Sequence, residues 1–372
     1  MKPDEITSYQ LWSATFGLLL VAAFYSLPRA VALVTSTAAP WAILLAGIVV
    51  FLMLWPTIAT LSERAGQNLT DLALQGGGRP LAITVALVFN AAIAASVGLS
   101  LRQASELVVT ALYPHTPQTF AMSTMMIASA LGAAMAPPNT FWLASLYVWP
   151  TLVSILLLLL GNIGWGQFRN AMPPFGHGIG PTLWEVIPLT SHFSPLMHLL
   201  VFSSFLPSGQ RLLRGTALAV LGGSVTWSLV ILFYLMIFPL PSGLSVPFPL
   251  FEMSRLVQGG RFLERIDAIW VVIWAFGSVL CTAVALLAGA RLYQEAFRLP
   301  DHRGAVLPLA IPTLAVALMP SNQADTIAVE SVVFRGVAYL VFFALPLLVT
   351  GLAWIRGRST ANAGGDGGSA GA

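Results

Sequence analysis

A chain of 372 residues that is 57% hydrophobic and only 8% charged is not an ordinary soluble domain, in which about a quarter of the residues carry charge. Its formal net charge of +3 comes from 17 basic and 14 acidic side chains, too few to form a nucleic-acid-binding surface. The single cysteine excludes an intrachain disulfide framework and a thiolate metal cluster. Long apolar runs separated by short polar loops therefore predict a bundle of transmembrane α-helices, because the strands of a membrane β-barrel alternate over about ten residues.

The apolar runs predict ten transmembrane helices, since about 20 apolar residues are needed to cross a bilayer. The predicted spans cover about residues 8–34, 39–62, 80–112, 118–136, 140–162, 181–206, 212–239, 263–297, 305–320 and 333–355. Residues 1–358 form one membrane domain in this interpretation. Residues 359–372 are rich in Gly, Ala and Ser, which predicts a disordered cytoplasmic tail.

The positions of the basic residues favour an even number of spans. Ten of the 17 Lys and Arg residues fall on the side of the membrane that holds both chain ends, and five fall on the other side. An excess of Lys and Arg marks cytoplasmic segments. We therefore predict an integral protein of the bacterial cell membrane, or of the spore inner membrane, with both termini in the cytoplasm.

The first span contains a proline-directed break at Tyr25-Ser26-Leu27-Pro28-Arg29, near the expected midplane. Proline lacks an N–H group and its ring clashes with the preceding turn, so the helix must bend or unwind there. Unwound backbone in a membrane is tolerated only where it is buried in protein or lines a cavity. The break is therefore a candidate binding site.

A second break of the same kind opens the second half of the chain, at Pro188-Leu189-Thr190-Ser191-His192-Phe193-Ser194-Pro195. Interrupted helices at corresponding positions of two halves indicate an inverted-repeat transporter fold. We predict two repeats of five helices, over about 8–162 and 181–356, with the first and sixth helices broken. Because five is odd, the second repeat would be inverted relative to the first.

Several motifs carry a family resemblance along nearly the whole chain. They are I-T-S-Y-Q-L-W near the N-terminus, S-L-P at the first break, L-R-Q-A-S-E-L at 101–107, F-P-L-F-E-M-S-R at 248–255 and F-L-E-R-I-D-A-I-W-V-V-I-W at 262–274. With these motifs the chain resembles the spore germination permease family (GerAB type) of the amino acid–polyamine–organocation transporter superfamily. The resemblance implies a leucine-transporter-like ten-helix fold and a membrane subunit of a nutrient germinant receptor. It also implies two partners, a larger membrane subunit and a lipoprotein subunit.

The two breaks form the predicted ligand site. Unwinding exposes backbone donors and acceptors, and helix ends carry about half an elementary charge, which suits the zwitterion of an amino acid. A simple proline kink filled by neighbouring helices is the alternative. His192 could be linked to proton binding or could be a satisfied buried histidine. The predicted ligand-binding residues are Tyr25, Ser26, Leu27, Pro28, Gly98, Thr190, Ser191, His192, Phe193, Ser194 and Ser278.

A few charged residues lie at or near the predicted membrane, and most of them are predicted to be structural. Arg29 follows the first break and could bind a ligand carboxylate or, as we prefer, pair with an acid from another helix. Arg102 and Glu106 are spaced i,i+4, which predicts an ion pair near the outer boundary. Around a predicted amphipathic helix at 249–258 lie further acidic residues, which are Glu252, Glu264 and Asp267.

Nucleophile, Walker and dinucleotide-binding motifs are absent from the sequence, as are metal-binding spacings such as H-E-x-x-H, so we predict neither an enzyme nor a bound metal or cofactor. Three functions remain open. The preferred one is a germinant sensor that binds a small nutrient, such as an amino acid, at the midplane and signals by conformational change. The others are a proton- or sodium-coupled amino acid transporter and a membrane subunit without a ligand.

Overall fold

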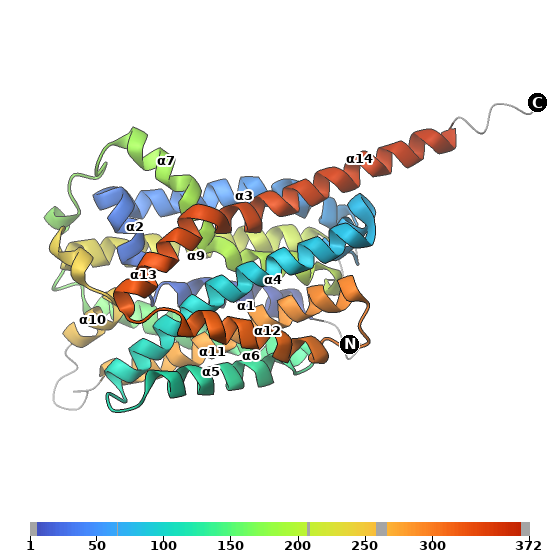
Figure 1. Cartoon of the computed structure of the whole chain (residues 1–372). Helices are drawn as coiled ribbons and strands as arrows, with labels where there is room; N and C mark the ends of the chain where they lie inside the picture. Colours follow the sequence, from blue (N-terminus) through green and yellow to red (C-terminus); the bar gives the residue numbers. More distant parts are fainter. Residues whose placement is uncertain (1–5, 65, 207–208, 258–265, 366–372) are drawn as a thin grey trace, which may run out of the picture.

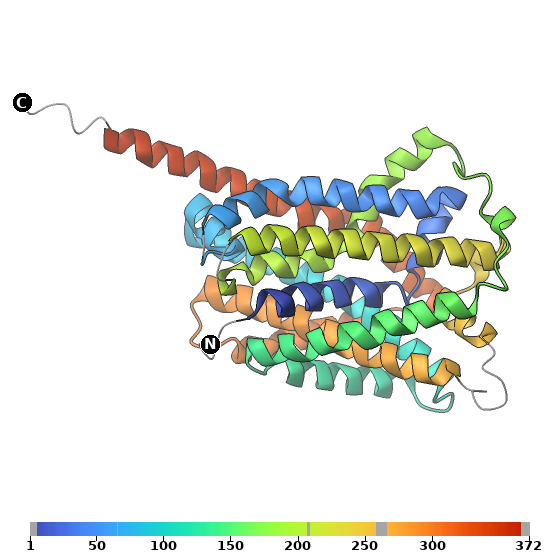
Figure 2. The same cartoon turned by 180° about the vertical axis from the view of Figure 1, so that it is seen from behind.

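The computed structural model describes residues 6–64, 66–206, 209–257 and 266–365, and within these ranges it contains helices and no strand. The helices run roughly along one common axis and form a single bundle (Figure 1). The first described residues and the end of the last helix lie at the same end of the bundle (Figures 1 and 2). An even number of crossings requires this arrangement.

The described helices follow the ten predicted spans. Their bounds are α1 Ser8–Ala22 and α2 Leu27–Thr35 (first span), α3 Ala39–Glu63, α4 Leu69–Ala111, α5 Gln118–Ala133, α6 Pro137–Gly161, α7 Ile179–Leu189 and α8 Met197–Val201 (sixth span), α9 Gly209–Ile237, α10 Pro249–Leu256, α11 Ile266–Phe297, α12 Arg303–Leu318, α13 Gln323–Val332 and α14 Leu345–Gly365. Among the described residues, six helical segments are each long and apolar enough to cross a membrane. The broken first and sixth spans divide into shorter helices. The short helix α10 lies between the seventh and eighth spans, where the sequence predicts an amphipathic helix.

Helix α4 is longer than the predicted third span because it contains an interruption. Gly78 interrupts its 43 residues with a φ of 70°, a conformation that favours glycine, and Pro80 restarts the helix. The segment before Gly78 is thus a separate helical piece at the end of the bundle, capped by the side chain of Asn68. The part after Pro80 matches the predicted span 80–112.

The last span differs from the prediction at both ends. It begins with α13 at Gln323, whereas the predicted span begins near residue 333. The prediction misses this start because the segment contains polar residues such as Asp325 and Glu330. Two π-helical segments, Val333–Ala338 and Leu340–Ala344, connect α13 to α14. Helix α14 extends past the predicted boundary at residue 358 to Gly365 and projects beyond the bundle (Figure 1), while residues 366–372 of the predicted tail lie outside the described residues.

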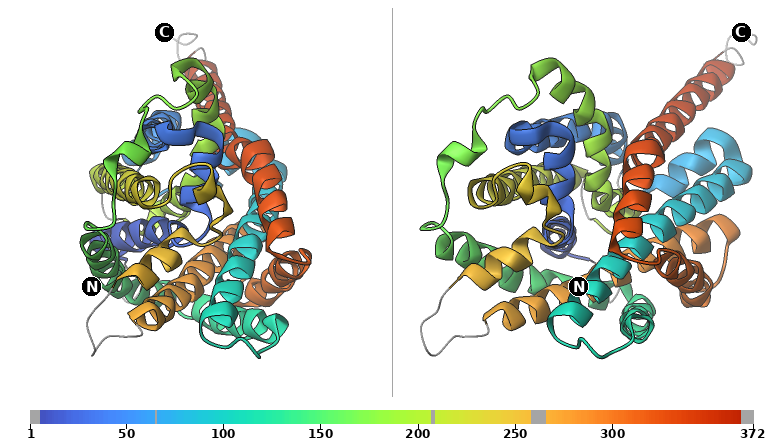
Figure 3. Two further views of the ribbon diagram at one scale, coloured as in Figure 1. Left: turned by 90° about the vertical axis from the view of Figure 1, so that its left-hand side faces the viewer. Right: turned by 60° about the vertical axis from the view of Figure 1, so that its left-hand side comes forward.

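The helices α3, α4, α9, α11 and α12 form a frame around the broken ones. Helix α4 packs along α11 and α12, and α3 packs along α9, while α1 lies between α6 and α9. The views in Figure 3 look obliquely and along the bundle, and they show α13 and α4 on one side with α2 and α7 opposite. The two breaks therefore lie inside the bundle, where neighbouring helices cover them.

Candidate functional site

The first break separates α1 from α2 by the turn 23–26. Ser26 precedes α2, and Pro28 stands in the first turn of that helix, where a missing N–H costs nothing. The backbone N–H of Ser26 donates to Oε1 of Gln103 on α4, at 3.1 Å. Its hydroxyl donates to Oε2 of Glu330 on α13, at 2.7 Å. The break is thus held by side chains from the third and tenth spans.

The second break is a 3-10 helix over Thr190–Leu196 that joins α7 to α8 between Pro188 and Pro195. The hydroxyl of Ser191 donates to the carbonyl oxygen of Phe334, at 2.5 Å. The ring of His192 stacks on the ring of Phe334, with the centroids 5.1 Å apart and an angle of 9° between the planes. Phe334 belongs to a π-helical segment, a distortion that is frequent at functional sites.

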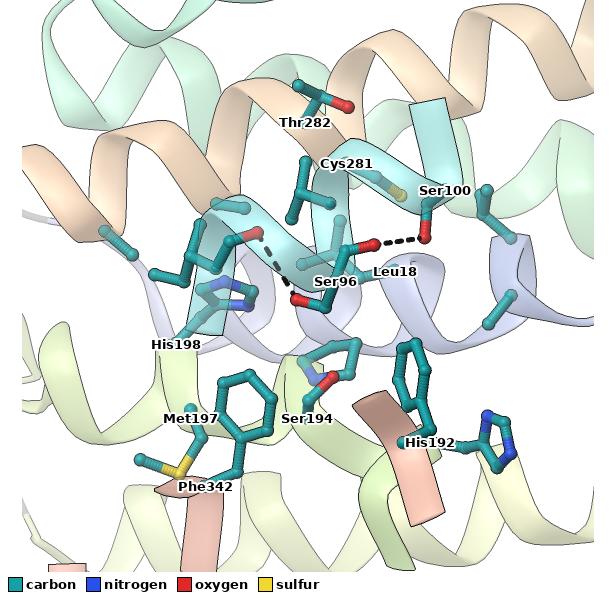
Figure 4. Close-up of a pocket in the computed structure, with 18 of the residues that line it drawn as sticks. Leu18, Ser96, Ser100, His192, Ser194, Met197, His198, Cys281, Thr282 and Phe342 are labelled. Atoms are coloured by element: carbon teal, nitrogen blue, oxygen red, sulfur yellow. Dashed lines mark hydrogen bonds between the residues drawn. The ribbon is translucent and has the colours of Figure 1, made fainter. Parts of the chain in front are cut away.

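A cavity of about 110 Å³, which we call the central cavity, lies between the two breaks. Figure 4 shows part of its lining, with labelled residues from α1, α4, α8, α11 and the second break. Ligand pockets for drug-sized molecules measure about 300–1,000 Å³, so this cavity suits a molecule of only a few heavy atoms. Its lining residues are Leu18, Val21, Ala22, Tyr25, Leu27, Phe89, Ile93, Ser96, Val97, Ser100, His192, Ser194, Pro195, Met197, His198, Val201, Ser278, Cys281, Thr282, Ala285, Ala288, Glu330, Phe334 and Phe342.

The lining of the central cavity is mostly apolar, with hydroxyl, imidazole, thiol and carboxyl groups among it. The hydroxyls of Tyr25 and Ser278 lie 2.5 Å apart and join the first break to α11. Next to this contact, Phe24 and Trp274 stack with ring centroids 4.2 Å apart. Nδ1 of His198 is buried without a hydrogen-bond partner among the described residues. An apolar lining with a few polar groups is typical of a small-molecule site.

The structure brings together five of the eleven residues predicted to bind a ligand. Tyr25, Leu27, His192, Ser194 and Ser278 line the central cavity.

The other six lie beside the central cavity or away from it. The hydroxyl of Ser26 donates to Glu330, which lines the central cavity, and Pro28 lies in the first turn of α2. Thr190 and Ser191 donate to the backbone carbonyls of Ile187 and Phe334. Phe193 packs on Trp227, and Gly98 lies against α12.

The sequence interpretation missed Glu330, Gln103 and Phe334. Glu330 and Phe334 belong to a span whose start was placed too late, and Gln103 lies next to Arg102, which was interpreted only as half of an ion pair. An ionisable residue within a transmembrane segment is a functional signal by itself. Extending the tenth span back over the polar residues would have found it.

The predicted structural charges are mostly paired. Arg102 Nε lies 3.9 Å from Glu106 Oε2, as the i,i+4 spacing predicted, and Glu252 pairs with Arg255 on α10 at 3.1 Å.

Arg29 forms no direct ion pair among the described contacts, but it attracts the acidic side chain of Glu330 on α13 electrostatically. Arg29 donates instead through Nε to the carbonyl oxygen of Leu244, at 2.5 Å. Asp267 lies in the first turn of α11, and Glu264 lies outside the described residues.

Gly98 is expected to act in packing. A Cβ atom there would lie 2.7 Å from the backbone oxygen of Thr313 and 2.9 Å from Val316 Cβ. The substitution Gly98→Val must therefore push α4 away from α12. Overpacking of this kind costs about 1–3 kcal/mol. We expect a lower thermal unfolding midpoint in detergent, with Gly351→Val, whose position has open space, as the matched control. Equal midpoints for the two variants would contradict this packing role.

Sequence comparison decides the family. The profile of a family described as "Spore germination protein" matches residues 5–326. The chain belongs to this family. A relative is the spore germination protein YndE of Bacillus subtilis (strain 168), which is 22% identical over 354 residues, covering 93% of this chain and 95% of YndE.

Solved structures with the same fold are transporters. Mhp1, a nucleobase-cation-symport-1 family transporter with bromovinylhydantoin bound, superposes with a TM-score of 0.65 at 12% identity, covering 98% of this chain and 96% of Mhp1. MhsT in complex with L-phenylalanine gives 0.67 at 14% identity, covering 93% and 91%. The family member described here thus has the leucine-transporter-like fold, an all-α inverted repeat of five and five helices with the first and sixth broken.

Proposed function

We propose that the chain is the membrane subunit of a spore nutrient-germinant receptor, which binds a small nutrient in the central cavity and signals by a change of conformation. The observation that carries the proposal is the cavity bounded by both helix breaks, one from each half of the chain. A ligand that contacts both breaks binds two conformations with different affinity, and this difference alone can shift their populations.

An amino acid is the nutrient class that best fits the proposal. The cavity volume of about 110 Å³ and its apolar lining favour a ligand with a small apolar side chain. The structural neighbour MhsT was solved with L-phenylalanine, which supports the class.

The partners and the location form part of the same proposal. A larger membrane subunit and a lipoprotein subunit would read the conformational change, as membership of the spore germination family suggests. The location would be the cell membrane or the spore inner membrane. The ten-to-five distribution of basic residues supports cytoplasmic termini.

Cys281 offers a direct test of ligand binding. It is the only cysteine of the chain and lines the central cavity. A ligand in the cavity should cover its thiol. We expect glycine, alanine or valine at saturating concentration to slow modification of Cys281 by a small methanethiosulfonate reagent by about tenfold or more, with Cys281→Ala as the background control. Equal rates with and without each amino acid would contradict the proposal.

A proton- or sodium-coupled amino acid transporter is the second candidate, because the chain shares its fold with a symport-family transporter. Proteoliposomes that contain only this chain separate the two functions. Saturable uptake of radiolabelled alanine that depends on an ion gradient would support the transporter and overturn the sensor. Binding without uptake supports the sensor.

A further inference from the structure

A second and smaller cavity, which we call the side cavity, adjoins the central one. It measures about 50 Å³ and lies between α2, α7 and α13. The two cavities share three lining side chains, His192, Glu330 and Phe334. The two cavities therefore meet at these side chains, and a ligand at this junction would contact both.

The charges of the site gather at this junction. Glu330 is the only Asp, Glu, Lys or Arg among the described residues that line the central cavity. The side cavity adds Arg29 and the pair Glu185–Arg335, whose charged atoms lie 2.7 Å apart. Since Glu185 and Arg335 neutralise each other, Arg29 and Glu330 remain as one positive and one negative group.

Arg29 and Glu330 line the same side cavity and attract each other electrostatically, although no direct ion pair joins them among the described contacts. Arg29 uses Nε on the carbonyl oxygen of Leu244, and its Nη1 is buried with no hydrogen-bond partner in the described part of the chain. Glu330 accepts from Ser26 through Oε2. Each group therefore keeps capacity for one more charged partner. Both side chains are half-buried, and a partly buried charge without a direct ion pair is costly, which favours a ligand that supplies both counter-charges.

We propose that Arg29 and Glu330 form the recognition site for the head group of an α-amino acid. This inference rests on the proposed function and identifies its ligand contacts. The guanidinium of Arg29 takes the carboxylate, because guanidinium and carboxylate form strong charge-assisted hydrogen bonds. Glu330 takes the ammonium group. The ligand side chain then enters the apolar central cavity, whose size limits it to a few heavy atoms.

The arrangement explains why a zwitterion is preferred to a simple amine or a simple acid. One positive and one negative side chain sum to zero, and a zwitterion leaves that balance unchanged. A ligand lacking its carboxylate leaves Arg29 unpaired, and a ligand lacking its ammonium group leaves Glu330 unpaired. Leaving a buried charge without its partner is costly.

The test uses the full chain in detergent and three probes of similar size, L-alanine, L-alaninamide and propionate. Binding is read as slower modification of Cys281. For the wild type we expect alanine to bind at least about 100-fold more tightly than either analogue. Arg29→Gln should lose most of its affinity for alanine but keep its weak affinity for alaninamide. Glu330→Gln should lose most of its affinity for alanine but keep its weak affinity for propionate.

Arg303→Gln is the matched control, because Arg303 is exposed at the surface and lies outside both cavities. Its affinity for alanine should stay within about threefold of the wild type. If Arg29→Gln does not fold, Arg29→Lys keeps the charge but loses the two-pronged geometry, and we expect it to bind alanine about tenfold more weakly.

Two negative results have different meanings. If the wild type binds alanine and both Arg29→Gln and Glu330→Gln bind it equally well, this inference is overturned while the proposed function stands. If the wild type binds none of glycine, alanine and valine, the proposed function itself fails and the head-group site fails with it.

Discussion

Ser100→Trp is expected to abolish ligand binding while leaving the fold in place. Ser100 lines the central cavity, and its hydroxyl donates only to the carbonyl oxygen of Ser96, one turn earlier on α4. The substitution therefore removes no contact between helices. An indole in a space of about 110 Å³ leaves little room for a ligand. We expect affinity for small amino acids to fall at least 100-fold, which corresponds to about 2.7 kcal/mol.

The matched control is Ala91→Trp, which places the same side chain at an exposed position of the same helix. Both variants should unfold at similar temperatures in detergent, and only Ser100→Trp should lose the protection of Cys281 by amino acids. In spores, Ser100→Trp should also lose the germination response. Wild-type affinity in Ser100→Trp would show that the ligand binds outside the central cavity.

The fold could be predicted from the sequence because hydrophobic runs and proline breaks act locally. In a bilayer each span must satisfy its own backbone hydrogen bonds, so length and apolarity identify it without knowledge of its neighbours. Pro28 and Pro188 break their helices by the same local sterics. The paired breaks then indicated the repeat, and the structural neighbours confirm the fold.

The contacts of the breaks could not be predicted in the same way. Glu330 meets Ser26 across 304 positions of the chain, and Phe334 meets Ser191 across 143. No local pattern encodes such pairs. The start of the tenth span could not be predicted either, since its first two turns carry polar side chains and its centre is π-helical. The sequence therefore located the two breaks but not the side chains that join them.

Gly98 illustrates a different limit. A glycine in the middle of a transmembrane helix fits both a ligand that approaches the backbone and a neighbouring helix that packs closely. The sequence does not distinguish the two. The closest atoms belong to Thr313 and Val316 of α12, so close helix packing explains this glycine.

The second large effect is expected at Asn68, at the end of the bundle that holds the chain termini. Its carboxamide oxygen accepts from the N–H groups of Thr70 and Asp71 and caps α4. Its Nδ2 donates to both carboxylate oxygens of Glu295 at the end of α11, at 3.0 Å each. A single side chain thus ties the start of α4 to the end of α11.

The contacts around Asn68 and Glu295 also extend to the sixth span. Arg291 lies 3.6 Å from Glu295 and covers the ring of Phe205, whose centroid is 5.0 Å from its guanidinium carbon. Phe205 belongs to the short 3-10 helix that follows α8. Loss of the Asn68–Glu295 contact should therefore loosen the broken sixth span as well as the frame helices.

The variant Asn68→Asp removes the contact with Glu295 while it keeps the helix cap, so it tests the two roles of Asn68 separately. Aspartate caps a helix about as well as asparagine, so the cap of α4 is retained. The new carboxylate faces Glu295 and replaces a hydrogen bond to a charged group, worth about 1.5–3 kcal/mol, with repulsion between like charges. We expect a lower thermal unfolding midpoint and faster modification of Cys281, because the end of the bundle opens more often.

The double variant Asn68→Asp with Glu295→Gln, compared with the two single variants, completes a double-mutant cycle. The introduced glutamine amide on α11 can donate to the introduced aspartate carboxylate before α4, which restores the contact with donor and acceptor exchanged. The unfolding midpoint should return most of the way to the wild-type value, and the two substitutions should be strongly non-additive, as expected for residues in contact. An additive result would show that Asn68 stabilises only its own helix. The labelling rate of Cys281 would then be independent of the tie between α4 and α11.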